Sequence, residues 1–241
     1  MTNSNKKAGQ STREMAQKRR KKSIQFLVFA LIIAVVIFLF STNKEAMGAI
    51  GGIGVLIMLV AIKVIPNILV DQSKKQDKLE RRAIRGAVGE EKIGDLLEAL
   101  GEDFFVINDV NSQFGNIDHV LIGKYCGIIL IETKSHRGKV TVENETLLNN
   151  GHLPEKDFIK QTLNNTYWIR DQLTPIIGTK PWIVSVIVFT NAFVSVYKPV
   201  KGITITNKKF LKQWIEKKST PGPSYLHYWD KRFEILAKLE S

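Results

Sequence analysis

The chain contains a single cysteine, Cys126, among its 241 residues. One cysteine excludes an intramolecular disulfide framework and a zinc site built on cysteine ligands. The chain also lacks the composition of disordered, collagenous or low-complexity proteins, because 44% of its residues are hydrophobic and only 17 are glycine and 7 proline. We therefore expect one folded domain with an appendage.

The whole chain carries a net charge of +12, and the scarcity of acidic residues behind it is greatest at the N-terminus. Such a charge usually indicates nucleic acid or an anionic membrane as a partner. Residues 1–22 contain eight Lys or Arg and only one acid, Glu14, for a net charge of +7, and residues 66–85 carry +3. The last 156 residues carry only +1. The basic pI of 9.7 therefore does not indicate that the C-terminal part binds nucleic acid.

Two apolar runs lie between these basic segments. Ile24–Phe40 contains no charged residue, and Ala46–Ile65 contains only Lys63. At ~1.5 Å of rise per residue, each run with its flanks approaches the ~30 Å hydrocarbon core of a bilayer. The short connector Ser41–Glu45 predicts a hairpin of two transmembrane helices. Because basic residues flank both outer ends, we expect both termini and the C-terminal domain to be cytoplasmic.

Other interpretations are a cleavable signal peptide for the first run and a buried core helix for the second. The apolar part of a signal peptide spans ~7–15 residues behind a short basic stretch, whereas the first run is longer, follows the 22-residue basic tail and Ser23, and precedes another run. The sequence therefore favours a basic cytoplasmic tail at 1–22, a transmembrane hairpin at 23–65 and a basic helical linker at 66–85.

The remaining sequence predicts an α/β domain. Its hydrophobic periodicity indicates a helix, three strands, a second helix and a buried strand, which together predict a mixed sheet flanked by helices. We expect one globular domain at 86–195 and further elements at 196–241 that pack on it. The expected helices are 72–100, 154–173, 207–218 and 224–240, and the expected strands are 104–108, 116–123, 127–134, 139–142, 182–190 and 202–206.

Three charged residues stand at the ends of apolar strand runs. Asp118 precedes Val120–Ile122, while Glu132 and Lys134 follow Ile128–Ile131. If the hairpin turn at residues 124–126 pairs Ile122 with Ile128, Asp118 lies opposite Glu132, and Lys134 shares their face. Opposite residues have Cβ atoms ~4.5–5.5 Å apart, which allows two carboxylates to share a divalent cation.

Oxygen ligands of this kind favour Mg²⁺ or Mn²⁺. Beside such an ion, Lys134 could position or deprotonate an attacking water, or stabilise negative charge on a phosphoryl group. The alternative is an ordinary cluster of salt bridges at the end of a sheet. Because an acid followed two residues later by Lys is common, this pattern alone favours the alternative.

The surrounding motifs change this balance. Gly86-Ala87-Val88-Gly89-Glu90 precedes the strands, and residues 116–123 (NIDHVLIG) and 131–134 (IETK) follow in order. Over residues 84–190 the chain resembles the NERD (nuclease-related) domain of the PD-(D/E)xK, restriction-endonuclease-like superfamily. This resemblance implies an α-β-β-β-α-β core.

The resemblance also implies roles for individual residues. Asp118 and Glu132 would be metal ligands, and Lys134 would be the catalytic lysine. Glu90 would be an additional acid that orients the site or supports a second ion; the alternative, a solvated helix face beside Glu91, is less favoured. Gln161 would be the polar residue beside the metal, although its segment also reads as an ordinary helix.

We therefore expect a membrane-anchored, cytoplasmic, Mg²⁺- or Mn²⁺-dependent nuclease that hydrolyses phosphodiester bonds in DNA or RNA. One alternative is a non-catalytic module that binds nucleic acid or protein at the membrane. Another is a scaffold whose cytoplasmic domain recognises protein. Metal-dependent cleavage of nucleic acid that requires the two acids and the lysine distinguishes the first hypothesis from the other two.

Overall fold

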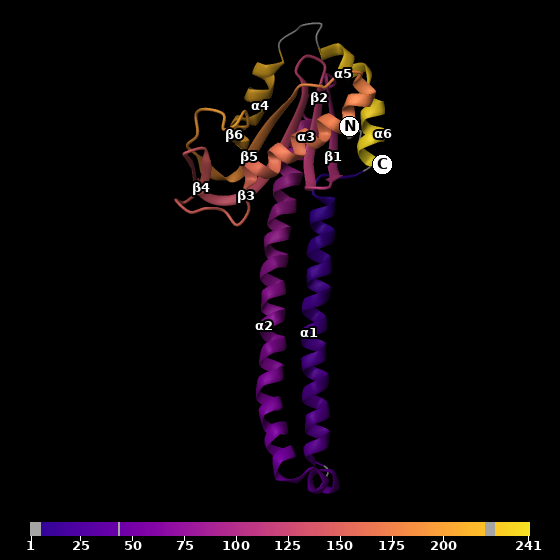
Figure 1. The fold of residues 1–241 in the computed structure, drawn as a ribbon, viewed down its shortest axis with the longest axis vertical. Helices are drawn as coiled ribbons and strands as arrows, with labels where there is room; N and C mark the ends of the chain where they lie inside the picture. Colours follow the sequence, from indigo (N-terminus) through magenta and orange to yellow (C-terminus); the bar gives the residue numbers. More distant parts are fainter. Residues whose placement is uncertain (1–5, 43, 220–224) are drawn as a thin grey trace. The chain divides into compact units, whose positions relative to one another are not determined.

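The structure, a computed structural model, describes residues 6–42, 44–219 and 225–241. It divides into two compact units. One contains residues 12–84, and the other contains residues 85–241 together with the N-terminal residues up to Ser11. Two long helices, α1 (Gln10–Thr42) and α2 (Lys44–Glu98), each contribute to both units (Figure 1).

Within the unit of residues 12–84, small side chains form the buried seam of α1. Ala16, Ser23 and Ala30, spaced seven residues apart, are 4%, 3% and 9% exposed. Seven-residue spacing keeps side chains on one side of a helix that packs along a partner. Ser23 Oγ lies 2.7 Å from Ser73 Oγ and donates to Asp77 Oδ1 at 2.5 Å, so α1 and α2 are joined by polar contacts at this seam.

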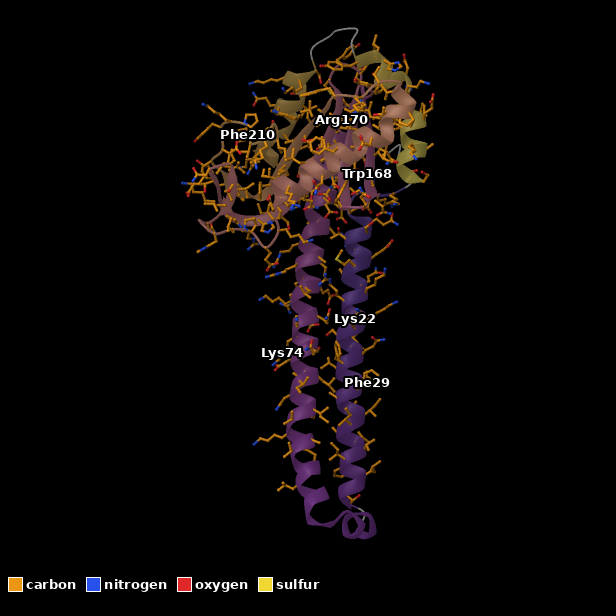
Figure 2. All side chains as sticks on the ribbon, viewed as in Figure 1. Lys22, Phe29, Lys74, Trp168, Arg170 and Phe210 are labelled. Atoms are coloured by element: carbon orange, nitrogen blue, oxygen red, sulfur yellow. The ribbon has the colours of Figure 1, made fainter. Side chains whose placement is uncertain are left out.

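The apolar side chains of α1 lie largely outside this seam. Phe29 and Leu31 are 58% and 65% exposed, and Figure 2 shows Phe29 projecting from its helix. Within the residues described, one helix segment, Gln10–Leu39, is long and apolar enough to cross a membrane. The second apolar run lies inside α2, and the expected turn at 41–45 includes residue 43, which lies outside the described residues.

The expected helix at 72–100 is the end of a much longer one. The 55 residues of α2 run from Lys44 to Glu98, so the boundary placed at residue 72 was wrong. Pro66 lies inside this helix without ending it. A proline inside a helix removes one backbone hydrogen bond, and α2 continues on both sides of Pro66.

The second unit contains a six-stranded mixed sheet. Strand order is β1-β2-β3-β5-β6, with β4 paired to β3; the β1–β2–β3 and β3–β4 pairs are antiparallel, and the β3–β5–β6 pairs are parallel. The strands are β1 (Phe104–Ser112), β2 (Gly115–Gly123), β3 (Gly127–Glu143), β4 (Thr146–Asn149), β5 (Ile183–Val194) and β6 (Thr204–Asn207). The predicted mixed α/β fold is therefore confirmed at this level.

Helices cover both faces of the sheet. On one face Val120 and Leu130 pack with α3 (Phe158–Ile177) and α6 (Arg232–Glu240). On the other, Leu121 and Ile129 pack with the end of α2 and with α4 (Lys208–Lys218). The alternation of neighbouring residues between two cores follows from the two-residue period of a strand. Figure 1 shows α3 crossing the sheet, near the short helix α5 (Leu226–Asp230) and α6.

Several predicted boundaries differ from the structure. The two strands expected at 127–134 and 139–142 form one strand, β3, with a register shift between Lys134 and Arg137. The helix expected from residue 154 begins at Phe158, because the Asp157 carboxylate caps it by accepting from Lys160 N–H. The helix expected at 224–240 is two helices, α5 and α6, and residue 224 lies outside the described residues. Strand β4 was not expected.

The N-terminal segment packs on this second unit. Asp109, only 1% exposed in β1, accepts from both the backbone N–H and the hydroxyl of Ser11 at 2.7 Å, and Asn116 Nδ2 also donates to its carboxylate. At Gly9, whose φ is +73°, an added Cβ would lie 2.9 Å from Ala87 O. The start of α1 is thus capped by a buried carboxylate from β1.

Candidate functional site

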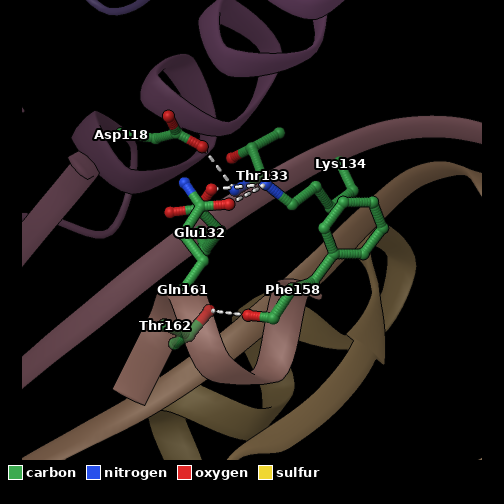
Figure 3. Close-up of polar contacts among 7 residues, drawn as sticks. All are labelled: Asp118, Glu132, Thr133, Lys134, Phe158, Gln161 and Thr162. Carbon is green, nitrogen blue, oxygen red and sulfur yellow. Dashed lines mark hydrogen bonds and ion pairs between the residues drawn. The ribbon is translucent and has the colours of Figure 1, made fainter. Parts of the chain in front are cut away.

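The predicted hairpin register is confirmed. Strand β2 pairs with β3 through Ile122–Ile128 and Val120–Leu130, and the last pair is His119–Ile131. The next positions in this register are Asp118 and Glu132. Here the ladder ends, and the Asp118 carboxylate accepts the Thr133 N–H at 2.5 Å (Figure 3). The turn therefore brings the two acids together at the end of the β2–β3 ladder.

Glu132 and Lys134 form a buried ion pair. Lys134 Nζ lies 2.5 Å from Glu132 Oε1, and the two side chains are only 12% and 3% exposed. The second oxygen of Glu132, Oε2, is buried and has no hydrogen-bond partner within the described residues. An unsatisfied carboxylate oxygen in the protein interior is unfavourable, so this atom is suited to an additional positively charged ligand.

The electrostatics of the cluster follow from its burial. Burial raises the pKa of Asp118 well above its usual value, and the carboxylates of Glu132 and Glu90 raise that pKa further. The Lys134 ammonium and the Thr133 N–H only partly offset this increase. Burial lowers the pKa of Lys134, but the three carboxylates outweigh it and hold that pKa above its usual value.

Lys134 is therefore charged at neutral pH. A charged ammonium donates hydrogen bonds, which suits interaction with negative charge; that Lys134 helps to deprotonate a water stays a prediction. Stabilising negative charge, the other role considered from the sequence, is compatible with this charged state.

Helix α3 places Gln161 beside the lysine. Gln161 Oε1 lies 3.5 Å from Lys134 Nζ, and the Phe158 ring lies 4.6 Å from the same ammonium (Figure 3). The sequence suggested Gln161 but not Phe158. Its position directly after the helix-capping Asp157 was the signal that this aromatic residue begins a helix facing the sheet.

Glu90 comes from the opposite layer, on α2. It is 7% exposed, so the alternative of a solvated helix face is wrong, and its charge raises the pKa values of Asp118 and Lys134. The neighbouring Gly89 packs against β3 and β5, because a Cβ there would lie 3.4 Å from Ser135 Cβ and 3.3 Å from Thr190 Oγ1. The tight contact brings this part of α2 against the sheet.

His119 lies outside the cluster. It is fully buried, and its Nδ1 lies 2.8 Å from Asn108 Oδ1. Burial lowers the pKa of His119 to about 3, despite a small opposing contribution from the Glu90 backbone. His119 is therefore a neutral core residue.

The residues present fit a small divalent cation. Within the ranges described, no group of three or more His, Cys, Asp or Glu side chains could hold a metal ion. The two ligands predicted from the sequence, Asp118 and Glu132, are a pair of carboxylates. Mg²⁺ is commonly held by one or two carboxylates with water and substrate phosphate completing its shell. A cation here would satisfy Glu132 Oε2 and relieve the repulsion between the acids.

The fold and this cluster define a protein with a buried acidic site at the end of the β2–β3 hairpin, next to α3. Residues 85–190 match the family model described as NERD, nuclease-related domain, and the match includes Glu90, Asp118, Glu132, Lys134 and Gln161. A nuclease-related domain is therefore present at residues 85–190. No curated protein and no solved structure matches the chain.

Proposed function

We propose that this protein is a membrane-anchored nuclease that hydrolyses phosphodiester bonds of nucleic acid with Mg²⁺ or Mn²⁺. The observation that carries the proposal is the buried set of Asp118, Glu132 and Lys134 within a nuclease-related domain. Under the proposal this domain has the PD-(D/E)xK type of site, with Glu90 as an additional orienting acid.

The side chains have distinct roles in this proposal. Asp118 and Glu132 would hold the ion; when bound, such an ion polarises a phosphoryl oxygen and makes a water molecule more acidic. Glu132 Oε1 and Gln161 Oε1 orient the Lys134 ammonium. Lys134 then donates hydrogen bonds to the phosphoryl oxygens, where negative charge develops during hydrolysis.

The membrane part of the proposal rests on the apolar surface of α1. In the apolar 18-residue window of its candidate span, only 6% of the residues are buried, and exposed apolar surface on this scale is unfavourable in water. We propose that residues 46–65 of α2 form a second span, and that the basic segments at 1–22 and 66–85 keep both ends cytoplasmic.

The test is cleavage by the full chain purified in a mild detergent. Labelled DNA and RNA oligonucleotides are incubated with Mg²⁺, Mn²⁺ or EDTA, and products are separated on a denaturing gel. The variants Asp118→Asn, Glu132→Gln and Lys134→Met remove each proposed function. The controls Glu102→Gln and Lys180→Met remove the same charges at exposed positions.

We expect cleavage only with a divalent ion, its loss in the three site variants, and normal cleavage by the two controls. Cleavage by Lys134→Met at the wild-type rate would contradict the proposal. Binding of nucleic acid without metal-dependent cleavage would instead support the non-catalytic module.

A further inference from the structure

A cavity lies beside the proposed active site, between α3 and the turn that joins β1 to β2. Its volume is about 280 Å³. Aromatic and amide side chains dominate the lining, together with one acid: Gln113, Phe114, Asn164, Tyr167, Trp168, Asp171 and Gln172. The proposed hydrolysis does not use these residues.

The aromatic members are open to a ligand. Phe114 and Tyr167 are 44% and 52% exposed, and they come from the β1–β2 turn and from α3. Figure 2 shows the neighbouring Trp168 and Arg170 on α3, and the Arg170 guanidinium lies 5.4 Å from the Tyr167 ring. Exposed rings with a stacked cation are a typical platform for nucleobases.

The cavity is held in place by polar contacts. Ser112 Oγ lies 2.7 Å from Asn165 Oδ1 and 2.7 Å from Gly115 O, and it accepts from Phe114 N–H at 3.1 Å. These contacts join the turn to α3, so the two walls of the cavity are fixed relative to each other.

The same turn links the cavity to the proposed active site. A Cβ at Gly115 would lie 3.7 Å from Gln161 Nε2, and Gln161 Oε1 contacts Lys134. Gln161 and Asn164 share one face of α3, about 4.5 Å apart along the helix axis. A strand with a phosphate at Lys134 would therefore have a neighbouring base within reach of the cavity.

We propose that this cavity binds an unpaired nucleobase and makes the protein selective for single-stranded nucleic acid. The Asp171 carboxylate disfavours a phosphate, whereas the amides and this carboxylate match the donors and acceptors on the edge of a base. In a duplex, the pairing edge of a base is hydrogen-bonded to its partner and its two faces are stacked. Only an unpaired base can therefore enter the cavity. This inference rests on the proposed function, because it names the substrate of the same site.

The test is binding by the full chain in detergent, with EDTA present so that no cleavage is needed. Fluorescence anisotropy of a labelled single-stranded DNA oligonucleotide gives the Kd, with its duplex and an abasic strand for comparison. Tyr167→Ala and Phe114→Ala remove the platform, while Tyr197→Ala and Phe210→Ala remove aromatic rings that are 91% and 60% exposed elsewhere.

We expect Tyr167→Ala to weaken single-strand binding about fivefold to a hundredfold, as for loss of one stacked base. The two control variants should bind the single strand with the Kd of the wild type. Tyr167→Ala should likewise leave the Kd for the duplex and for the abasic strand unchanged. Equal binding by Tyr167→Ala and Tyr197→Ala, or a preference for duplex, would overturn the proposal.

The two proposals fail in different ways. Tyr167-dependent binding of single strands without cleavage in Mg²⁺ would refute hydrolysis and leave the base site intact. Cleavage that is lost in Lys134→Met but unchanged in Tyr167→Ala, with no change in Kd, would refute the base site and leave hydrolysis intact.

Discussion

Burial separates the charged residues of the candidate site from the ordinary charged surface. Lys212 and Glu216 lie 3.9 Å apart on α4 with side chains 57% and 54% exposed, and such pairs contribute about 0–1 kcal/mol to stability. Lys134 and Glu132 are 12% and 3% exposed. Removing one partner of a buried pair typically destabilises a protein by about 3–5 kcal/mol.

Lys134→Met should therefore destabilise the domain by about 3–5 kcal/mol, because Glu132 is left buried without its partner. The double variant Glu132→Gln/Lys134→Met should recover part of that stability but no cleavage. Urea denaturation of the full chain can be followed by tryptophan fluorescence, since all four tryptophans lie beyond residue 85. Equal stability of Lys134→Met and the exposed control Lys180→Met would contradict the burial argument.

The pH dependence of stability should show two opposite contributions. The native pKa of His119, about 3, is below the 6.5 of a free imidazole, so its contribution is complete above pH 6.5 and is lost as the pH falls toward 3. The raised pKa of Asp118 acts in reverse: its contribution is complete below 3.8 and is lost as the pH rises through the raised value.

We therefore expect His119→Gln to reduce, and Asp118→Asn to increase, the loss of unfolding free energy between pH 7 and pH 4.5. The measurement is urea denaturation at both pH values in EDTA, with the exposed His152→Gln as the control. If both variants changed this loss of unfolding free energy in the same direction, burial would not set the two pKa values.

At the scale of elements, patterns local to a strand or turn were predicted well. The tight turn at 124–126 and the flanking apolar runs predicted the β2–β3 register, and with it the meeting of Asp118 and Glu132. That Glu90 is buried depends on how α2 packs on β3 and β5. Packing between distant elements has no local signal, so the sequence left its position open.

The sequence also failed to predict the end of β1, because contacts with distant residues decide it. The strand expected at 104–108 continues to Ser112 through Asp109, whose φ of 60° is rare outside glycine. Polar residues such as Asn108 and Asp109 indicate a strand end by composition. Both side chains contact residues outside β1: Asn108 Oδ1 lies 2.8 Å from His119 Nδ1, and Asp109 accepts from Ser11 N–H.

The contact between Asp109 and Ser11 should stabilise the domain. Asp109→Asn weakens three donations to the carboxylate, and the expected loss is about 1–3 kcal/mol, because hydrogen bonds to charged groups are stronger than neutral ones. Trypsin should also cleave faster at the N-terminal lysines. Asp103→Asn, in a surface pair with Lys124, is the matched control, and equal denaturation midpoints for the two variants would contradict this role.

At the scale of the whole molecule, the distribution of charge and apolar surface supports the proposed membrane anchor more than a basic surface that binds nucleic acid. Net charge is concentrated at residues 1–22 and 66–85, and the apolar residues between them are largely exposed on α1. The proposed base site would therefore provide binding free energy that the near-neutral domain cannot gain from charge, since stacking does not require a basic surface.

The proposed topology predicts which positions react from each side of the membrane. Cys126 is only 5% exposed, so new cysteines can be labelled selectively in cells that express the full chain. Leu153→Cys, at a position 71% exposed, should react with an impermeant maleimide only after permeabilisation, whereas Thr42→Cys should react in intact cells. Labelling of Leu153→Cys in intact cells would contradict a cytoplasmic domain.

The proposed hydrolysis requires Asp118 and Glu132 together to hold the ion. Crystals of the full chain soaked with Mn²⁺ test it directly, because anomalous scattering locates the ion without any assumption about activity. We expect one Mn²⁺ peak between the two carboxylates in the wild type, its loss in Glu132→Gln, and its retention in Glu102→Gln. Carboxylates without an ion, in a chain that cleaves nucleic acid with Mn²⁺, would contradict the proposed metal site.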